Sequence, residues 1–362
     1  MKLFCSALDP SGNRHLSKLL KKGEERGVEF QYTGLFSSHL TSPRGAPLLP
    51  TEELAVMGFL ELLPKLPLLR RALREGVEEA LQADKVLLID APSFNLRLAA
   101  GICRRGGKRP PIYYYILPKV WAWKRKRIQI VEEFTDFQLY IFPFERHFWK
   151  RGVYIGNPIL EEVEYPSKEL LHRRQESKII AFLPGSRPME IKRLMPLFRE
   201  LNRRLAKKGF EGELVVPPHL FPPPRELYGD ISQFILSTST RESLRRARFG
   251  FICSGTATLE GALTGLPLAL LYRASWVDYW IGRTFVTNIS HVGLANIIGE
   301  FEGWGELHPE YLQKFPVEEL IHLPLSPNFS AAYTSALRLW DYFQKPATPN
   351  LLPLLFNSNS PT

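Results

Sequence analysis

IIAFLPGSRPMEIKRL, residues 179–194, is the stretch of sequence that decides the fold. Its first five residues form a continuous apolar run, which is typical of a buried strand. The turn Pro184-Gly185-Ser186-Arg187 follows, and residues 190–208 then show the apolar spacing of a long basic helix. A buried strand that leads directly into a helix is the repeating unit of a parallel sheet covered by helices.

The same strand–helix alternation continues along the whole chain. Apolar runs predict further strands at residues 2–7, 85–89, 112–116, 137–142, 213–216, 234–236, 249–253 and 267–272. Helical spacing is found at residues 14–22, 68–81 and 256–264. The pattern predicts an α/β protein with two doubly wound, Rossmann-like domains facing a cleft, because ligands bind at the carboxyl ends of such strands.

The domain organisation follows from the length and from one break in the pattern. A chain of 362 residues exceeds the usual size of a single hydrophobic core. The alternation restarts near Lys178, after a charged and strand-poor stretch at 161–176. We therefore expect an N-terminal domain at 1–164, completed by a helix at 330–345, and a C-terminal domain at 165–329. The tail at 346–362 is rich in Pro, Asn and Ser, which predicts loose order.

Composition restricts the compartment and the kind of partner. Three scattered cysteines form neither a disulfide framework nor a metal-ligand spacing. No secretory signal is recognised, and no apolar run approaches the roughly 18–20 residues that span a bilayer. We therefore expect a cytoplasmic protein. The formal net charge of +10 favours an anionic partner, for which nucleic acid, lipid headgroups and phosphorylated small molecules all qualify.

Two glycine turns in the second half have the pattern of an anion site. In the first, Gly185 lets backbone N–H groups approach an anion, Ser186 precedes the helix, and Arg187 supplies a fork of donors. On its own this turn is slightly better explained as a polar turn with a helix cap. The second turn places Gly255 and Thr256 between another strand and another helix. Two helix N-termini at one sheet edge predict a cradle for a diphosphate.

The helix after the second turn carries further signals. Glu260 lies one turn in, where a carboxylate can hold ribose hydroxyls, and Gly265 and Pro267 end the helix. A Glu, four intervening residues, a Gly and then a Pro are similar to the nucleotide-sugar site of GT-B glycosyltransferases. Arg273, beyond the next strand, can reach the same phosphates. Neither GxxxxGK[ST] nor GxGxxG occurs, which disfavours an ATPase or a nicotinamide enzyme.

In the first half, KVLLIDAPSFN at 85–95 delivers Asp90 to the carboxyl end of a buried strand. Sugar transfer with inversion needs a base that takes the proton of the attacking hydroxyl, and a positioned carboxylate suffices. An isolated Asp after a strand is more often an Asx-turn or a helix cap. The assignment of Asp90 as a base therefore depends on the rest of the chain.

Nine segments strengthen that assignment because of their order. They are ELAVMGFLELL (53–63), LLIDAPSFN (87–95), PKVWAWKRKRI (118–128), FPFE (142–145), YIGNP (154–158), FLPGSRPMEI (182–191), SGTATLEGAL (254–263), LANII (294–298) and HPEYLQ (308–313). Together they resemble the lipid-A-disaccharide synthase family, from the first strand to about residue 320. LLIDAPSFN, PKVWAWKRKR and PGSR with the later SGTATLE are specific as a set, although no single one is.

The resemblance implies a GT-B enzyme of lipid A biosynthesis in a Gram-negative bacterium, without a metal or cofactor. It would transfer 2,3-diacylglucosamine from its UDP conjugate to the 6-hydroxyl of 2,3-diacylglucosamine 1-phosphate (lipid X), giving a β-1′,6-linked disaccharide and UDP. By position, Asp90 is the implied general base and Arg187 the contact to donor phosphate. The other residues implied on the UDP side are Gly185, Ser186, Gly255, Thr256, Glu260, Arg273, Asn296, Glu310 and Gln313.

The chain departs from the family at two acidic positions. The opening turn is usually Glu-x-Ser-Gly-Asp but reads DPSGN at 9–13, so the first acid is kept and the second is an Asn. The expected residues of this acceptor-side turn are Asp9, Ser11, Gly12 and Asn13. Where the family often has IDAPDFN, this chain has Ser93. We expect Asp90 to act as the base alone; an inactive homologue that only binds lipid is the alternative.

Acyl chains on both implied substrates require contact with a bilayer. Residues 54–69 are apolar with few charges, and Pro64 and Pro67 are expected to break a core helix there. In the family this segment is an exposed patch beside the acceptor site. The membrane patch expected here is Val56, Met57, Leu60, Leu62, Leu63, Leu66 and Leu69. With nearby basic residues and WAWKRKR meeting anionic headgroups, we expect peripheral association with the cytoplasmic face of the inner membrane.

Other interpretations stay open. Another UDP-sugar transferase or an epimerase of similar architecture would share the glycine turns but has no reason to expose residues 54–69. Alternating basic and aromatic residues in WAWKRKR suggest nucleic-acid binding, but no RRM, KH, zinc or helix-turn-helix signature supports it. The expected partners are therefore UDP-diacylglucosamine and lipid X, without nucleic acid. The sequence leaves the oligomeric state open, a homodimer included.

Overall fold

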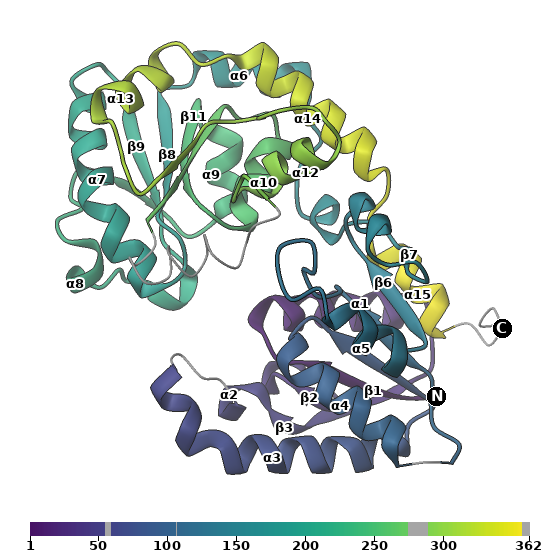
Figure 1. Ribbon diagram of the computed structural model, residues 1–362. Helices are drawn as coiled ribbons and strands as arrows, with labels where there is room; N and C mark the ends of the chain where they lie inside the picture. The colour runs from purple at the N-terminus through teal and green to yellow at the C-terminus, as the bar shows by residue number, and fades with distance from the viewer. Residues whose placement is uncertain (55–58, 106, 274–288, 357–362) are drawn as a thin grey trace. The chain divides into compact units, whose positions relative to one another are not determined.

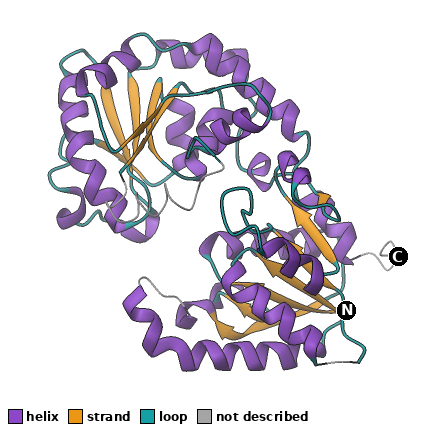
Figure 2. Ribbon diagram, viewed as in Figure 1, coloured by secondary structure: helices purple, strands orange, loops and turns teal. Residues whose placement is uncertain are grey.

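The computed structural model describes residues 1–54, 59–105, 107–273 and 289–356, without the side chains of residues 54 and 59–65. It contains two compact units (Figure 1): unit 1 is Met1–Pro158 with Lys345–Thr362, and unit 2 is Ile159–Gln344. Each unit is built on one parallel sheet, with helices on both of its faces (Figure 2). The predicted α/β class with two doubly wound domains is thereby confirmed.

Unit 1 has a seven-stranded sheet in the order β3-β2-β1-β4-β5-β6-β7. Its strands are β1 (Lys2–Ala7), β2 (Gln31–Phe36), β3 (Gly45–Pro50), β4 (Lys85–Ile89), β5 (Ile112–Tyr115), β6 (Phe137–Tyr140) and β7 (Val153–Tyr154). Its helices are α1 (Pro10–Glu25), α2 (Thr51–Leu54), α3 (Phe59–Leu81), α4 (Pro92–Arg104), α5 (Arg127–Phe134) and α15 (Thr348–Phe356), with short 3-10 turns η1 (Ser38–Leu40) and η2 (Pro143–His147).

The central strand β4 explains why this sheet is covered on both sides. Val86 and Leu88 point into a core formed with α3, α4 and α5. Leu87 and Ile89 point into the opposite core, formed with α1 and α15. A strand that is apolar on both faces can only be accommodated between two layers of helices.

Unit 2 has a six-stranded sheet in the order β10-β9-β8-β11-β12-β13. Its strands are β8 (Ile179–Leu183), β9 (Glu211–Val215), β10 (Ile235–Ser237), β11 (Phe249–Cys253), β12 (Leu268–Tyr272) and β13 (Glu310–Leu312). Its helices are α6 (Lys168–Glu176), α7 (Pro188–Ala206), α8 (Arg225–Tyr228), α9 (Thr240–Arg246), α10 (Thr256–Leu263), α12 (Leu294–Phe301), α13 (Val317–Leu325) and α14 (Phe329–Phe343). Short turns η3 (Pro158–Glu161) and η4 (Pro218–Leu220) complete it.

The C-terminal part of the chain differs from the sequence-based expectation. Helix α14 belongs to unit 2, where it contacts α10, and does not complete the N-terminal domain. The chain re-enters unit 1 at Lys345, and the tail forms helix α15 instead of a loose segment up to residue 356. Leu351, Leu352 and Leu355 are buried on one face of this helix. Their burial outweighs the polar composition around them.

A second difference concerns the start of α3. The helix begins at Phe59 and continues through Pro64 and Pro67, so the predicted break is wrong. A proline removes one backbone donor from a helix. Pro64 and Pro67 are the sixth and ninth residues of α3, past the first turn, so each leaves the carbonyl four residues earlier without its helical donor.

Candidate functional site

Asp90 lies at the carboxyl end of β4, in a strained turn. Asp90 and Ala91 both adopt left-handed backbone conformations, with φ of 47° and 44°. The buried Asn95 holds the turn, because its Nδ2 donates to the carbonyl oxygens of Ile89 (3.2 Å) and Asp90 (2.9 Å). The hydroxyl of Tyr114 also donates to the Asp90 carbonyl, at 2.9 Å. Such strain persists only where its surroundings enforce it, and it clusters at functional sites.

The environment of the Asp90 carboxylate makes it a stronger base. Burial raises the pKa of Asp90 above its ordinary value, and the neighbouring negative charge of Asp9 raises it further. The positive charges of Lys119 and Arg127, and a hydrogen bond from the Ala91 backbone, lower the pKa and partly offset the burial. A carboxylate that holds a proton more tightly accepts one more readily from a substrate hydroxyl.

The residues of the opening turn surround this end of the sheet. Helix α1 begins at Pro10, so the Ser11-Gly12-Asn13 part of the turn is helical. Nδ2 of Asn13 donates to the carbonyls of Ala7 (2.8 Å) and Asp9 (3.1 Å), and Oδ1 accepts from the Ser37 N–H at 2.7 Å. An aspartate could not donate these two bonds. Asn13 therefore stabilises the turn in a way that the family acid could not.

Two cations near Asp90, Lys119 and Arg127, belong to the family segment PKVWAWKRKRI (118–128), and the sequence assigns neither of them a role at Asp90. Lys119 is exposed on the segment after β5, and Arg127 is the first residue of α5. A guanidinium nitrogen of Arg127 lies 3.4 Å from the Ser93 hydroxyl. The exposed ring of Trp123 carries Lys124 at 4.2 Å and Arg127 at 5.5 Å from its centroid. Their role could not be found from the sequence, since their proximity to Asp90 arises from the pairing of β4 with β5.

In unit 2, the turn after β8 depends on a glycine. Gly185 has φ of 100°, and a Cβ at this position would lie 2.5 Å from Oε2 of Glu190. That carboxylate accepts from the Arg187 N–H at 3.4 Å and pairs with the Arg187 guanidinium at 3.3 Å. The side chain of Arg187 is otherwise 79% exposed. The turn thus presents a cation and backbone donors at the start of α7.

The sheet order of unit 2 brings four chain segments to one edge. Strands β8, β11, β12 and β13 are consecutive neighbours and all parallel, so their carboxyl ends share that edge. After these ends come the Gly185 turn, the Gly255-Thr256 turn, Arg273 and Gln313. A guanidinium nitrogen of Arg273 lies 3.4 Å from the Gln313 carbonyl oxygen. Ser186, Gly255 and Thr256 are exposed, as a binding surface requires.

Glu260 occupies a different position. It is half-buried on the second turn of α10. There it lines a small cavity together with Arg241, Arg245 and Thr264. The structure therefore places Glu260 beside α9.

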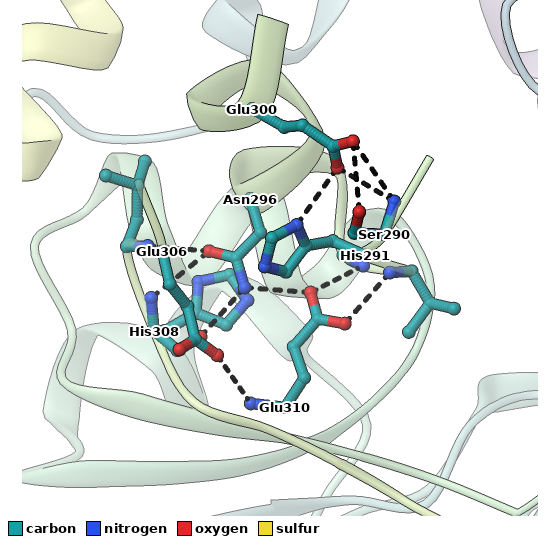
Figure 3. A network of polar contacts seen from close by, with 10 residues as sticks. Ser290, His291, Asn296, Glu300, Glu306, His308 and Glu310 are labelled. Carbon is teal, nitrogen blue, oxygen red and sulfur yellow. Dashed lines mark hydrogen bonds and ion pairs between the residues drawn. The ribbon is translucent and has the colours of Figure 1, made fainter. Parts of the chain in front are cut away.

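Asn296 and Glu310 form a network that supports the loop before α12 (Figure 3). The Asn296 amide is fully buried and donates to the His308 carbonyl and to Oε1 of Glu310, both at 2.8 Å. Glu310 in turn accepts from the N–H groups of Val292 (2.8 Å) and Gly293 (2.9 Å) at the start of α12. These side chains are engaged within the protein, so direct contact of Asn296 with a nucleotide is not what the structure indicates.

The same network continues to the surface through Glu300. Its carboxylate accepts from the Ser290 N–H at 2.9 Å and contacts the His291 ring at 3.1 Å (Figure 3). In the same network, burial of the His308 ring lowers its pKa to about 4, so this ring stays neutral at pH 7. The carboxylate at the N-terminal end of α12 is that of Glu310. It occupies the position that an anionic ligand would need.

The expected membrane patch is only partly described. Val56, Met57 and the side chains of Leu60, Leu62 and Leu63 lie outside the described residues. Leu66 is half-buried, and Leu69 packs partly against the core of unit 1. Among the described residues, none of the helices has the length and apolar character needed to cross a bilayer.

The fold defines the class of protein. Two parallel sheets, each with helices on both faces, form the architecture of a GT-B glycosyltransferase. The fold is similar to that of Acinetobacter baumannii MurG, with a TM-score of 0.55 at 12% identity over 98% of each chain. It is equally similar to Arabidopsis thaliana UGT89C1 complexed with UDP, with a TM-score of 0.56 at 12% identity over 98% of each chain. The GT-B fold is confirmed.

Sequence comparison then identifies the family. The model of the lipid-A-disaccharide synthetase family matches residues 3–331. The chain is 40% identical over 365 residues to the lipid-A-disaccharide synthase of Campylobacter jejuni strain RM1221, covering 98% of both. It is 39% identical over 355 residues to that of Helicobacter acinonychis, covering 94% of both. The chain belongs to the lipid-A-disaccharide synthetase family, and is a hexosyltransferase.

Proposed function

We propose that this protein transfers 2,3-diacylglucosamine from its UDP conjugate to the 6-hydroxyl of 2,3-diacylglucosamine 1-phosphate, forming a β-1′,6 linkage and releasing UDP. Asp90 takes the proton of the attacking hydroxyl. The observation that carries this role is the strained, half-buried turn in which Asp90 has a raised pKa beside Lys119 and Arg127. Inversion follows because the hydroxyl attacks the anomeric carbon on the face opposite to the departing UDP.

Unit 2 holds the UDP of the donor. The turns at Gly185 and Gly255 offer backbone N–H groups at the starts of α7 and α10, and Arg187 adds a cation. Negative charge grows on the β-phosphate as the bond to the sugar breaks. A cation and oriented N–H groups that stabilise this charge lower the barrier for departure of UDP.

Release of UDP from the two purified substrates tests the proposal. Replacement Asp90→Asn keeps the shape of the side chain but removes the base, so kcat should fall by roughly a hundredfold to ten-thousandfold. The matched control is Asp341→Asn, which removes an exposed carboxylate from α14 of unit 2 and should leave kcat unchanged. Turnover near the wild-type rate in Asp90→Asn would refute the assignment of the base.

A second outcome separates this reaction from the rival functions. Another UDP-sugar transferase would release UDP with an acceptor other than 2,3-diacylglucosamine 1-phosphate. An epimerase would convert the UDP-sugar into its epimer without any acceptor and without net release of UDP. An inactive lipid-binding homologue, suggested by Asn13 and Ser93, would release none. The case for inactivity is weaker because the Asn13 side chain is hydrogen-bonded to Ala7, Asp9 and Ser37, and Ser93 lies beside Arg127.

We further propose that the protein works as a peripheral protein on the cytoplasmic face of the inner membrane. Trp123 is 43% exposed, and Lys124, Arg125 and Lys126 beside it are exposed as well. An indole prefers the interface of a bilayer, and cations next to it are attracted to anionic headgroups. Sedimentation with anionic vesicles at low salt should capture the protein, and Trp123→Ala should weaken capture. Ile235→Ala, which shortens an exposed side chain of unit 2, is the control.

A further inference from the structure

Glu145 is a carboxylate buried in the interior of unit 1. Its exposed fraction is 2%. Oε1 accepts a hydrogen bond from the indole N–H of Trp121 at 3.2 Å. Oε2 accepts from the backbone N–H groups of Ile141 (3.2 Å) and Phe142 (3.1 Å). The carboxylate therefore joins the turn η2 to a segment that lies more than twenty residues earlier in the chain.

That segment, residues 116–126, connects β5 to α5 and is strained. Ile116 at its beginning and Lys124 near its end have left-handed backbone angles, with φ of 62° and 54°. A β-branched residue such as Ile rarely adopts this conformation, so the surrounding structure must enforce it. Glu145 supplies one such restraint through Trp121, which is itself 2% exposed.

Two further contacts join the segment at 116–126 to η2 and to Phe148, the residue that follows η2. The ring of Trp121 packs edge-on against that of Phe144, with centroids 5.5 Å apart at an angle of 79°. The guanidinium of Arg125 lies over the ring of Phe148 at 5.8 Å. The segment is thus attached to η2 along its length, and Glu145 provides the hydrogen-bonded point of attachment.

The segment carries one cation that acts on Asp90 and leads directly into the other. Lys119 lies two residues before Trp121, and Arg127 is the first residue of α5, directly after the segment. Both lower the pKa of Asp90 against the effect of burial. Displacement of the segment would change the field at the Asp90 carboxylate and the surroundings of any substrate hydroxyl next to it.

Burying a carboxylate for this purpose carries a physical cost. Burial raises the pKa of Glu145 to about 7, while hydrogen bonds from Phe142, Ile141 and Trp121 and the charge of Lys119 oppose that rise. Burial raises the pKa values of the nearby Tyr140 and Tyr154, and the charge of Glu145 raises both further. Packing alone would be served at lower cost by a neutral side chain. A carboxylate differs from such a side chain because its two oxygens can accept hydrogen bonds from all three N–H donors.

We infer that Glu145 is a positioning residue for the transfer reaction, which holds the segment at 116–126 so that Lys119 and Arg127 lie beside Asp90. This role rests on the proposed function, because it acts through the proposed base. It does not involve the donor turns of unit 2. Loss of Glu145 should therefore affect the acceptor side of the reaction and leave binding of the UDP-sugar unchanged.

The test is steady-state kinetics of Glu145→Gln with both substrates varied. Gln presents one oxygen and an NH2 group, so at least one of the three N–H donors faces another donor. We expect kcat/KM for the acceptor to fall by roughly tenfold to a hundredfold, as small displacements of reacting groups do. The KM for the UDP-sugar should stay at the wild-type value. Glu133→Gln, an exposed carboxylate on α5, is the charge-matched control and should keep wild-type kinetics.

A milder variant keeps the inference testable if Glu145→Gln does not fold. Trp121→Phe removes the N–H donor but keeps an aromatic ring against Phe144. It should show the same selective loss, and the double variant should lose no more than Glu145→Gln alone. Folded variants with wild-type kcat and acceptor KM, or with an equal loss on the donor side, would overturn the inference. A wild-type protein that releases no UDP would instead overturn the proposed function, and this role with it.

Discussion

At the scale of single residues, the chemistry of Asp90 depends on charges that the fold brings to it. Desolvation raises its pKa, and Lys119 is the cation that opposes this most. The base is active only when ionised, so the rate rises with pH through this pKa. Lys119→Met should therefore move the acidic limb of the pH profile of kcat/KM to higher pH. Lys126→Met removes an equal charge from the same segment, and it should leave the limb in place. An unchanged limb in Lys119→Met would contradict this account.

Glu145 should make the stability of the protein depend on pH. Its pKa in the folded protein is about 7, above the ordinary value of 4.5, so the folded chain binds this proton more tightly than the unfolded chain. The stability linked to this proton is present below about pH 4.5 and is lost as pH rises through about 7. Glu145→Gln lacks the titration. Between about pH 5 and about pH 8, the wild type should lose up to about 3 kcal/mol relative to the variant.

Thermal unfolding of the two proteins at both pH values measures this difference. The midpoint of the wild type should fall relative to that of Glu145→Gln as pH is raised. A constant separation of the two midpoints would mean that Glu145 has an ordinary pKa and does not titrate in the folded protein.

The sequence reveals single residues to the extent that their partners are close in the chain. Asp90, Gly185 and Gly255 could be selected because a strand and a helix flank each of them. The buried position of Asn296 could not be predicted, since its partners His308 and Glu310 reach it only through the loop that leads to β13. The sequence marks Glu145 only as part of the segment FPFE, and its bond to Trp121 depends on how β5 and β6 are placed.

At the scale of elements, the starts of helices carry the donor site, and Gly185 fixes the start of α7. An added Cβ would meet the Glu190 carboxylate, which caps this helix. Gly185→Ala should therefore displace Glu190 and Arg187, raise the donor KM about tenfold or more, and destabilise unit 2 by roughly 1–3 kcal/mol. Gly209→Ala is the matched control, because Gly209 has φ of 86° but no atom within 4 Å of its added Cβ. It should lose stability without a change in donor KM.

Isothermal titration of UDP and urea unfolding separate the two effects. Equal losses of UDP affinity in both glycine variants would show that the backbone angle alone, and not the Glu190 carboxylate, matters at the turn. Intact affinity in Gly185→Ala would remove the turn from the donor site.

Element prediction succeeds for the central strands, but among the four edge strands it finds only β10, and it also misses β2 beside the edge strand β3. The predicted bounds of β1, β4, β8 and β11 are those of the structure, because these strands are apolar on both faces. Strand β3 reads GAPLLP and lies at a sheet edge, where its prolines are tolerated but hide the strand pattern. The edge strands β7 and β13 have only two and three residues, too few for any period to appear.

At the scale of the whole molecule, the chain ends by returning to the unit in which it began. The sequence does not predict this return, since the composition of the tail conceals three leucines on one helical face. The returning chain passes close to Gly156, where a Cβ would lie 2.4 Å from the Lys345 carbonyl oxygen. The N–H of Asn157 donates to the same oxygen at 3.0 Å, and Nδ2 of Asn350 donates to the Ile155 carbonyl at 3.0 Å. The family segment YIGNP is thus the docking point of the C-terminus.

Removal of α15 should therefore unfold unit 1 while unit 2 stays folded. The helix contacts α1, and Leu351, Leu352 and Leu355 fill the core between α1 and the sheet. Each fully buried leucine contributes about 1.5–3 kcal/mol, so loss of all three is comparable with the stability of a whole domain. A chain that ends at residue 344 should be cleaved by protease within residues 1–158 and should not turn over substrate. The point variant Leu355→Ala should cost about 2–5 kcal/mol.

The control for this deletion is a chain that ends at residue 356, which keeps every described contact of α15. It should match the wild type in thermal midpoint and in turnover. Because unit 2 contains the donor turns, the chain that ends at residue 344 should still bind UDP even though unit 1 is lost. Protection of residues 1–158 from protease in that chain would show that α15 covers the sheet without stabilising it. Loss of UDP binding would show that unit 2 does not fold independently of unit 1.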